Sequence, residues 1–153
     1  MDKLTDDEEL SMAISVAAEA FENKFDKGGK PYILHCLEVM NGVKHLGPKA
    51  MSVAVLHDII EDCDDWWEAR LVETGFSFDV VNDVCELSRG EDEDYIEYIM
   101  NISKSSVLTA IKMADLRHNM DPSRLPSLSE KHLNRMTKYY TAYKLLLDRQ
   151  KGM

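Results

Sequence analysis

The run His57-Asp58-Ile59-Ile60-Glu61-Asp62 places four ionisable side chains inside an apolar helical pattern. Val53 and Ala54 lie on the same faces one turn earlier, so a helix predicted over 48–62 is expected to be covered on this side. Charged groups are costly to bury alone, and they need a metal ion, a partner or a substrate beside them. The chain must therefore fold so that other polar groups meet this helix.

Two more polar intrusions interrupt apolar patterns elsewhere. His35 lies among the apolar residues of segment 31–36. Asp115 continues the apolar face of a helix predicted over 106–119, and Asn119 lies one turn beyond it. A carboxylate in that position is expected to be a ligand or a member of a buried ion pair.

These intrusions predict one metal site assembled from three separated segments. Two imidazoles and two carboxylates form a mixed ligand set that suits Mn²⁺ or Fe²⁺, with Zn²⁺ as an alternative. Glu61 and Asp62 follow one turn later, at the separation wanted for proton-transfer groups that do not bind the ion. The predicted ligands are His35, His57, Asp58 and Asp115.

Each of these features also has a plainer explanation. A lone histidine on an apolar helix is often a hydrogen-bonded core residue, and an acidic run such as 61–65 is usually a solvated helix end. Asp115 could pair with Lys112 or Arg117 on its own helix. Residue spacing alone leaves these alternatives open.

Helix signals recur along the whole chain. Capping-box spacing opens helices at Thr5–Glu8 and Ser127–Glu130, and Pro31 and Pro48 suit the first helical position after glycine breaks. No alternating pattern predicts strands, although 76–81 is ambiguous, and no linker separates two domains. These patterns predict an all-α fold, an irregular helical bundle in a single domain over 1–153.

Apolar spacing also predicts which side chains face the core. The first helix is expected to extend its buried face as far as Phe25. Asp64 or Asp65 is expected to cap a short helix that contains Trp66 and Trp67. The last helix is expected to turn five side chains inward: Leu133, Met136, Tyr140, Tyr143 and Leu147.

The charge distribution limits the classes of partner. Residues 1–103 carry 8 basic and 24 acidic side chains and residues 104–153 carry 10 and 4, so the C-terminal third is basic in a chain of net charge −10. An acidic protein is a poor candidate for binding duplex nucleic acid, which needs broad phosphate neutralisation. The basic third could form a pocket for a phosphorylated small molecule, or simply decorate exposed helix faces.

Three scattered cysteines without a CxxC pair, and an acidic N-terminus without an apolar core, favour reduced thiols and a cytoplasmic location. No apolar run is long enough to span a bilayer, so no membrane partner is expected. The sequence is compatible with a monomer and with a homo-oligomer.

Three motifs in order resemble those of the HD-domain metal-dependent phosphohydrolases: KPYILH at 30–35, LHDIIED at 56–62 and IKMADLRHNM at 111–120. The branch that fits best is the hydrolase domain of the RelA/SpoT alarmone enzymes and their small stand-alone relatives, over about residues 10–145. The resemblance implies an all-α fold and one Mn²⁺ bound by the four predicted ligands. It also implies that Glu61 and Asp62 are catalytic and that Asn119 contacts the substrate.

In the alarmone branch the reaction releases pyrophosphate from the 3′ position of guanosine tetra- or pentaphosphate. By that resemblance Glu61 handles the proton and Asp62 orients the water or the surroundings of the ion. Lys112 and Arg124 are the residues expected to help neutralise charge on phosphate oxygens.

Asp26 departs from the alarmone pattern. These hydrolases usually carry a basic residue, commonly arginine, nine positions before the first histidine, where it packs against guanine. Here Lys24 and Lys27 flank that position, and Lys27 is a further candidate for substrate binding.

The leading hypothesis is an enzyme that hydrolyses a nucleotide phosphoester, with guanosine 3′,5′-bis(diphosphate) 3′-pyrophosphohydrolase as the first candidate. Asp26 keeps two alternatives open. The first is another phosphoester, such as a deoxynucleoside monophosphate or a nicotinamide dinucleotide phosphate. The second is a non-catalytic helical module that binds a nucleotide or a protein.

Overall fold

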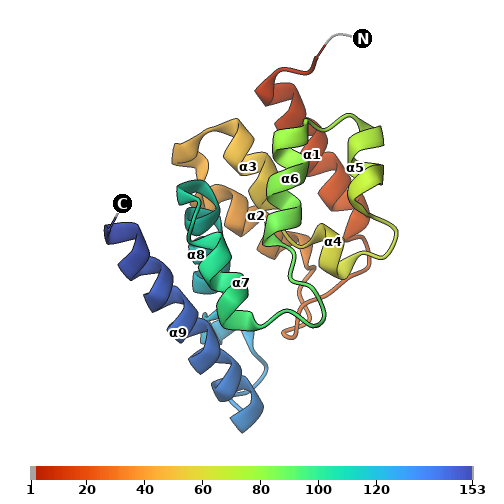
Figure 1. Cartoon of the computed structure of the whole chain (residues 1–153). Helices are drawn as coiled ribbons and strands as arrows, with labels where there is room; N and C mark the ends of the chain where they lie inside the picture. The colour runs from red at the N-terminus through yellow and green to blue at the C-terminus, as the bar shows by residue number, and fades with distance from the viewer. Residues whose placement is uncertain (1–2, 153) are drawn as a thin grey trace.

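Helices follow one another throughout the computed structural model, which describes residues 3–152 (Figure 1). Within that range there is no β-strand, and a single isolated bridge joins Phe25 to Pro31. The predicted all-α fold is confirmed. The elements are α1 (Asp6–Ala20), α2 (Ile33–Gly42), η1 (Lys44–Leu46), α3 (Pro48–Val55), α4 (Ile59–Asp62), α5 (Glu68–Thr74), α6 (Phe78–Leu87), α7 (Tyr95–Ile102), α8 (Ser106–Asn119), η2 (Pro122–Arg124) and α9 (Glu130–Lys151).

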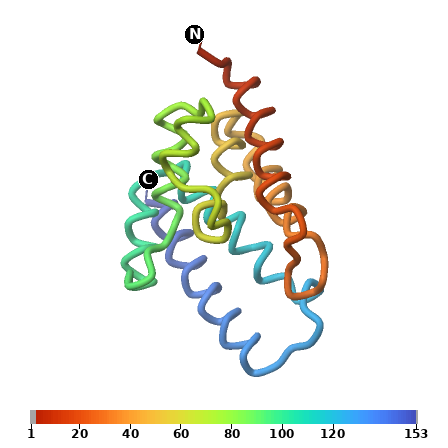
Figure 2. The backbone as a smooth tube through the Cα atoms, turned by 90° about the vertical axis from the view of Figure 1, so that its right-hand side faces the viewer, coloured from red at the N-terminus to blue at the C-terminus, as the bar shows by residue number. Residues whose placement is uncertain are grey.

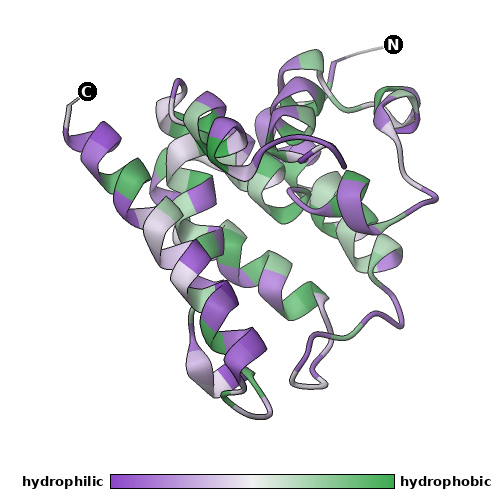
Figure 3. Cartoon of the chain, turned by 60° about the horizontal axis from the view of Figure 1, so that its bottom comes forward, coloured by the Kyte–Doolittle hydropathy of each residue, from purple (hydrophilic) through white to green (hydrophobic). Residues whose placement is uncertain are grey.

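Two helices organise the bundle. Helix α3 is surrounded by α1, α2 and α6, and helix α8 packs against α2 and against α9. Figure 2 shows α9 running beside α8, and Figure 3 shows hydrophilic residues along much of α9. The described helices share one interior, and none of them is long and apolar enough to cross a membrane.

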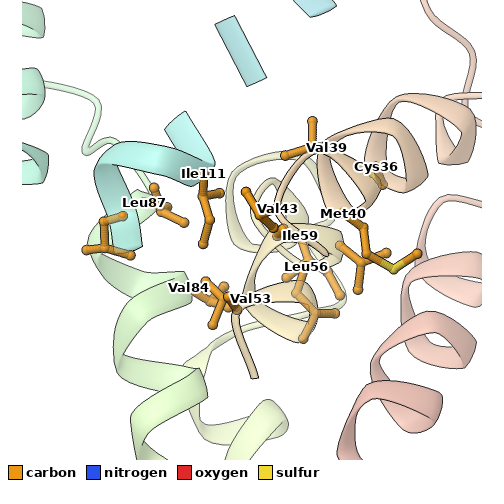
Figure 4. Packing of buried hydrophobic residues seen from close by; sticks show 14 of the residues in the cluster. Cys36, Val39, Met40, Val43, Val53, Leu56, Ile59, Val84, Leu87 and Ile111 are labelled. Atoms are coloured by element: carbon orange, nitrogen blue, oxygen red, sulfur yellow. The ribbon is translucent and has the colours of Figure 1, made fainter. Parts of the chain in front are cut away.

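The core lies where α2, α3, α6 and α8 meet the turn before α4 (Figure 4). Burying one aliphatic side chain stabilises a fold by about 1.5–3 kcal/mol, so these helices are held firmly in place. The residues labelled in Figure 4 are Cys36, Val39, Met40, Val43, Val53, Leu56, Ile59, Val84, Leu87 and Ile111.

Local capping explains where several helices begin. The predicted capping box at Thr5 is present, with Thr5 and Glu8 each accepting the other's backbone N–H at 3.1 Å. Ser105 caps α8, which begins and ends at the predicted residues. The last helix begins two residues later than predicted, because Ser129 and not Ser127 accepts the His132 N–H.

The predicted continuous helix over 48–62 is wrong in its middle. Helix α3 ends at Val55 and α4 begins at Ile59. Between them Leu56 and Asp58 have ψ values near 0°, outside the helical range, and the His57 N–H reaches the Ala54 carbonyl three residues back at 3.2 Å. The run that the sequence places on one helix therefore lies across a tight turn.

Three aromatic residues were misplaced by the sequence patterns. Phe25 is 62% exposed because α1 ends at Ala20 and the chain turns away from the core. Trp66 and Trp67 precede α5 and do not lie within it. Trp67 occupies the N-cap position, and no side chain caps this helix. Trp66 is nevertheless buried.

The buried face of α9 also differs from the prediction. Leu133 and Tyr140 are 48% and 58% exposed, whereas Ala142 and Leu146 are fully buried. Because the N-terminal part of α9 projects beside an open cleft, it has few core neighbours to bury an apolar stripe.

Candidate metal centre

Four side chains from α2, the α3–α4 turn and α8 converge inside the bundle. His35 Nε2 lies 3.0 Å from Asp115 Oδ1 and 3.8 Å from Asp58 Oδ2. His57 Nε2 lies 3.0 Å from Asp58 Oδ2 and 3.3 Å from Asp115 Oδ1, and one potential ligand atom from each residue lies within 4.8 Å of all the others. Neighbouring ligands about 2.1 Å from an octahedral ion are about 3 Å apart, so the cluster fits one divalent cation.

The turn between α3 and α4 aims His57 at this cluster. Its ring Nδ1–H donates to the Ala54 carbonyl at 2.7 Å, and this carbonyl also accepts the His57 backbone N–H at 3.2 Å, whereas in a continuous helix it would accept the Asp58 N–H. The other ring nitrogen, Nε2, is buried and has no hydrogen-bond partner within residues 3–152. A buried lone pair facing two carboxylates is unfavourable unless a cation lies between them, so the donor set fits a metal.

Without a cation, the same charges act on each other. Burial lowers the pKa of His57, but Asp58 and Asp115 outweigh burial and raise this pKa well above its usual value. Burial also opposes ionisation of Asp115, yet Lys112 and His57 hold its pKa well below normal. A proton on His57 and a divalent cation thus compete for one position, as expected of a metal ligand.

Asp115 is held by two residues of its own helix. Lys112 Nζ lies 2.8 Å from Asp115 Oδ2, and Asn119 Nδ2 donates to Asp115 Oδ1 at 2.9 Å. The Lys112 side chain is 13% exposed, and its Nζ lies 5.2 Å from the centre of the Tyr98 ring. The geometry therefore agrees with both explanations of Asp115: it pairs with Lys112, and it is placed to bind a metal ion.

Two further residues support the cluster, and neither is among the predicted ligands. Tyr32 Oη donates to Asp58 Oδ2 at 2.6 Å, and His118 Nδ1 lies 2.7 Å from Nδ1 of His35. Tyr32 precedes His35 by three residues and His118 follows Asp115 by three, a spacing that places side chains on one helix face. That spacing was the signal available in the sequence.

Glu61 and Asp62 lie one turn beyond the cluster, in α4, and neither contributes to the four-residue set. Glu61 Oε1 accepts the backbone N–H of Arg89, and the Asp62 carbonyl accepts a hydrogen bond from Lys24 Nζ at 3.0 Å. Burial raises the pKa of both carboxyls, that of Asp62 to about 6, and the charge of Asp58 adds to both shifts. Carboxyl groups whose pKa is raised above the ordinary value are better proton acceptors and donors for catalysis than unperturbed ones.

A cleft of about 290 Å³ opens beside the cluster, between the 25–32 segment, the 119–125 segment and α9. Tyr32 and Asn119 line this cleft and also contact the cluster. The lining includes three cationic side chains, Lys27, Arg124 and Arg135. Arg135 was not among the predicted substrate-binding residues, although it lies in the basic third of the chain.

Burial and the cationic side chains in and near the cleft, Arg135 and Lys131, lower the pKa of Lys27. Of the predicted substrate-binding residues, Lys27, Arg124 and Asn119 line the cleft, whereas Lys112 lies behind Asp115. The cleft lining thus carries three cationic side chains and one carboxylate, that of Asp26, which lies 3.3 Å from Arg124.

Comparison with known proteins gives a consistent group of relatives. A guanosine-3′,5′-bis(diphosphate) 3′-pyrophosphohydrolase of Haemophilus influenzae is 31% identical over 116 residues, which cover 69% of this chain and 17% of that protein. One of the same name from Vibrio cholerae is 28% identical over 124 residues, covering 74% and 18%. A probable GTP pyrophosphokinase of Mycobacterium leprae is 31% identical over 124 residues, covering 75% and 16%. The chain spans about a sixth of the length of these relatives.

No family model matches the chain. A solved structure described as a metazoan ortholog of SpoT that hydrolyses ppGpp superposes with a TM-score of 0.74, covering 94% of this chain and 86% of that chain at 23% identity. At this identity the likeness establishes the fold alone. The predicted resemblance to the RelA/SpoT-type hydrolase domain is confirmed by the sequence relatives, and the helical architecture by the structural neighbour.

Proposed function

The chain belongs to the RelA/SpoT-type family of alarmone enzymes, and we propose that it is a metal-dependent phosphohydrolase acting on a phosphorylated nucleotide. The first candidate substrate is guanosine 3′,5′-bis(diphosphate), cleaved to release pyrophosphate from the 3′ position. The observation that carries the proposal is the buried His57 Nε2, which faces two carboxylates without a hydrogen-bond partner within residues 3–152.

We assign the cation to His35, His57, Asp58 and Asp115 and name Mn²⁺ as the first candidate, because two imidazoles and two carboxylates suit it. A divalent cation supplies Lewis-acid chemistry in such a site: it acidifies water and offsets charge on phosphate oxygens.

The remaining roles follow from position and charge. Glu61 and Asp62 lie beside the cluster with raised pKa values, and we assign them to accept and deliver the proton of the attacking water. Arg124 and Lys27 line the cleft and can neutralise the phosphate groups of the substrate. Asn119 contacts both the cleft and Asp115, so it can orient the substrate against the cluster.

The test is pyrophosphate release from the alarmone by the purified protein, with Mn²⁺, Mg²⁺ or Zn²⁺ added after chelation. We expect turnover with at least one of these ions and none with His57→Ala or Glu61→Gln. A matched control is Glu91→Gln, an exposed carboxylate of the acidic loop after α6, which should retain activity. Metal binding without turnover of the alarmone would refute this substrate.

A different nucleotide is the second candidate because Asp26 stands where the relatives' pattern has a basic residue. A panel of deoxynucleoside monophosphates and nicotinamide dinucleotide phosphates, assayed for phosphate release, separates the two. A protein that binds nucleotides with no turnover across the panel would be a binding module.

We also propose a cytoplasmic location, which is supported by three cysteines that are all free thiols.

A further inference from the structure

Asp26 occupies the position where a basic residue was expected to pack against guanine. In this structure its side chain belongs to a series of hydrogen bonds that leads to the candidate metal ligands. Its Oδ2 lies 3.3 Å from Arg124 Nη2. Arg124 Nη1 in turn donates to the Asn119 side-chain oxygen at 3.2 Å and to the His118 carbonyl at 2.9 Å. Arg124 thus bridges the 26–30 loop and the C-terminal end of α8.

The two residues that Arg124 binds are those that support the cluster. Asn119 Nδ2 donates to Asp115 at 2.9 Å, and the His118 ring lies 2.7 Å from that of His35. Hydrogen-bond partners outside the ligand set orient ligands and commonly change metal affinity or activity by about 10–100-fold when removed. A path of side chains therefore runs from Asp26 through Arg124 and Asn119 to Asp115, and a second branch reaches His35 through the backbone carbonyl and the ring of His118.

The loop that carries Asp26 is itself fixed. Asp26 Oδ1 accepts the backbone N–H groups of Gly28 at 3.0 Å and Lys30 at 2.9 Å. A Cβ atom on Gly28 would lie 2.3 Å from the Arg124 carbonyl oxygen, so the loop and the η2 turn touch backbone to backbone. Figure 2 shows these two loops side by side, one orange and one light blue.

We propose that Asp26 is a positioning residue that holds Arg124, and through it Asn119 and His118, so that Asp115 and His35 are set for the cation. The proposal rests on the proposed function only in naming a divalent cation as the ligand of the cluster. It assigns Asp26 to the metal centre instead of to recognition of a nucleobase.

Metal affinity and substrate kinetics together test this assignment. In Asp26→Asn the remaining carbonyl oxygen can still accept the loop N–H groups, while the negative charge opposite Arg124 is lost. We expect the Mn²⁺ dissociation constant, measured by calorimetric titration of chelator-treated protein, to rise about 3- to 10-fold, and kcat to fall by a larger factor than the KM for the nucleotide rises, because Arg124 keeps its charge in the cleft. Glu22→Gln, which alters an exposed acidic side chain of the same segment, is the matched control and should leave both unchanged.

Asp26→Arg distinguishes the two possible roles of this position. A positioning role predicts weaker Mn²⁺ binding, because two guanidinium groups would repel each other across the loop. A nucleobase role predicts unchanged Mn²⁺ binding and a lower KM for the guanine nucleotide, and that result would overturn the proposal.

If the Asp26 variants fail to fold, Arg124→Lys tests the same path, because lysine keeps the charge but lacks the guanidinium fork that joins Asp26 on Nη2 to Asn119 and His118 on Nη1. Arg124→Lys should weaken Mn²⁺ binding as Asp26→Asn does. The double variant that carries both substitutions should bind Mn²⁺ no more weakly than the more affected single variant. Additive effects would contradict the shared path.

The inference and the proposed function fail in different ways. If the wild-type protein binds Mn²⁺ but hydrolyses nothing, and the variants bind Mn²⁺ more weakly, the proposed function fails and the positioning role of Asp26 stands. If the wild-type protein hydrolyses the nucleotide and all three variants keep its Mn²⁺ affinity, the proposed function stands and the positioning role fails.

Discussion

At the scale of single residues, the two nitrogens of His57 have separate tasks. Nδ1 binds the Ala54 carbonyl and ends α3, while Nε2 faces Asp58 and Asp115. The ring hydrogen bond thus fixes the direction of the free lone pair, within a turn that the His57 backbone N–H also closes. The sequence could identify His57 as an unusual residue, but not which nitrogen would be free, because that depends on a local bond to the backbone.

Asp62 should make the stability of the metal-free protein depend on pH. Burial raises its folded-state pKa from the usual value of 3.8 to about 6, so the unfolded chain releases this proton at lower pH than the folded chain. Stability is therefore lost between about pH 4 and 6 as pH rises. Asp62→Asn removes that loss, and we expect it to be more stable than wild type by about 1 kcal/mol at pH 7, after discounting for solvent exposure.

Urea unfolding in the presence of a chelator measures this difference at a series of pH values. The advantage of Asp62→Asn should vanish near pH 4, where Asp62 is largely protonated in the folded state and close to half protonated in the unfolded chain. An advantage that is the same at pH 4 and pH 7 would show that the charge of Asp62 is not its cause.

Lys112 should matter more to the metal-free protein than to the metal-bound one. Lys112→Met leaves the buried Asp115 carboxylate without its 2.8 Å partner, and breaking such a pair costs about 3 kcal/mol. A cation bound to Asp115 takes over part of this neutralisation, so we expect a smaller loss with saturating Mn²⁺. Chemical unfolding with and without Mn²⁺ tests this, with the exposed Lys144→Met as control; equal losses in both conditions would argue against it.

At the scale of elements, local signals located helix ends well where a side chain caps the backbone. Helix α8 runs over the predicted residues because Ser105 caps it, and α1 has the predicted box at Thr5. The prediction failed at the turn between α3 and α4, where a side-chain hydrogen bond to the backbone sets the conformation. The turn that divides 48–62 replaces a helical hydrogen bond by one from an imidazole, which apolar periodicity cannot register.

The face of α9 provides a direct test of packing. Leu146 is fully buried, whereas Tyr140, which the apolar spacing also assigned to the core, is 58% exposed. Leu146→Ala should cost about 2–5 kcal/mol through lost burial and the cavity left behind. Tyr140→Ser should change the free energy of unfolding by less than about 1 kcal/mol, as measured by urea denaturation. Similar losses for both would show that α9 packs by a different face.

At the scale of the whole molecule, the candidate metal centre joins α2, the α3–α4 turn and α8, which lie far apart in the sequence. A cation bound there holds these three segments together in the folded state. Because the unfolded chain does not gather its ligands, binding adds to folding stability by mass action.

Adding Mn²⁺ to chelator-treated protein should therefore raise its melting temperature in a concentration-dependent way. At a free concentration about 100 times the dissociation constant the gain is about 2.7 kcal/mol, or roughly 5–10 °C for a chain of this size. His57→Ala should show no such rise in a thermal shift experiment. A rise of equal size in that variant would place the bound ion outside the cluster.

Sequence patterns were sufficient to predict the helical class, the starts of α1, α3 and α8, and the side chains of the candidate centre. Capping and apolar spacing act over a few residues, and buried charges interrupt that spacing. How those side chains meet depends on the packing of distant segments. The turn at His57 and the buried face of α9 depend on contacts that no local pattern contains. Asp26 differs from its expected type, yet its tie to Arg124, 98 residues away, became visible only when the chain folded the two loops together.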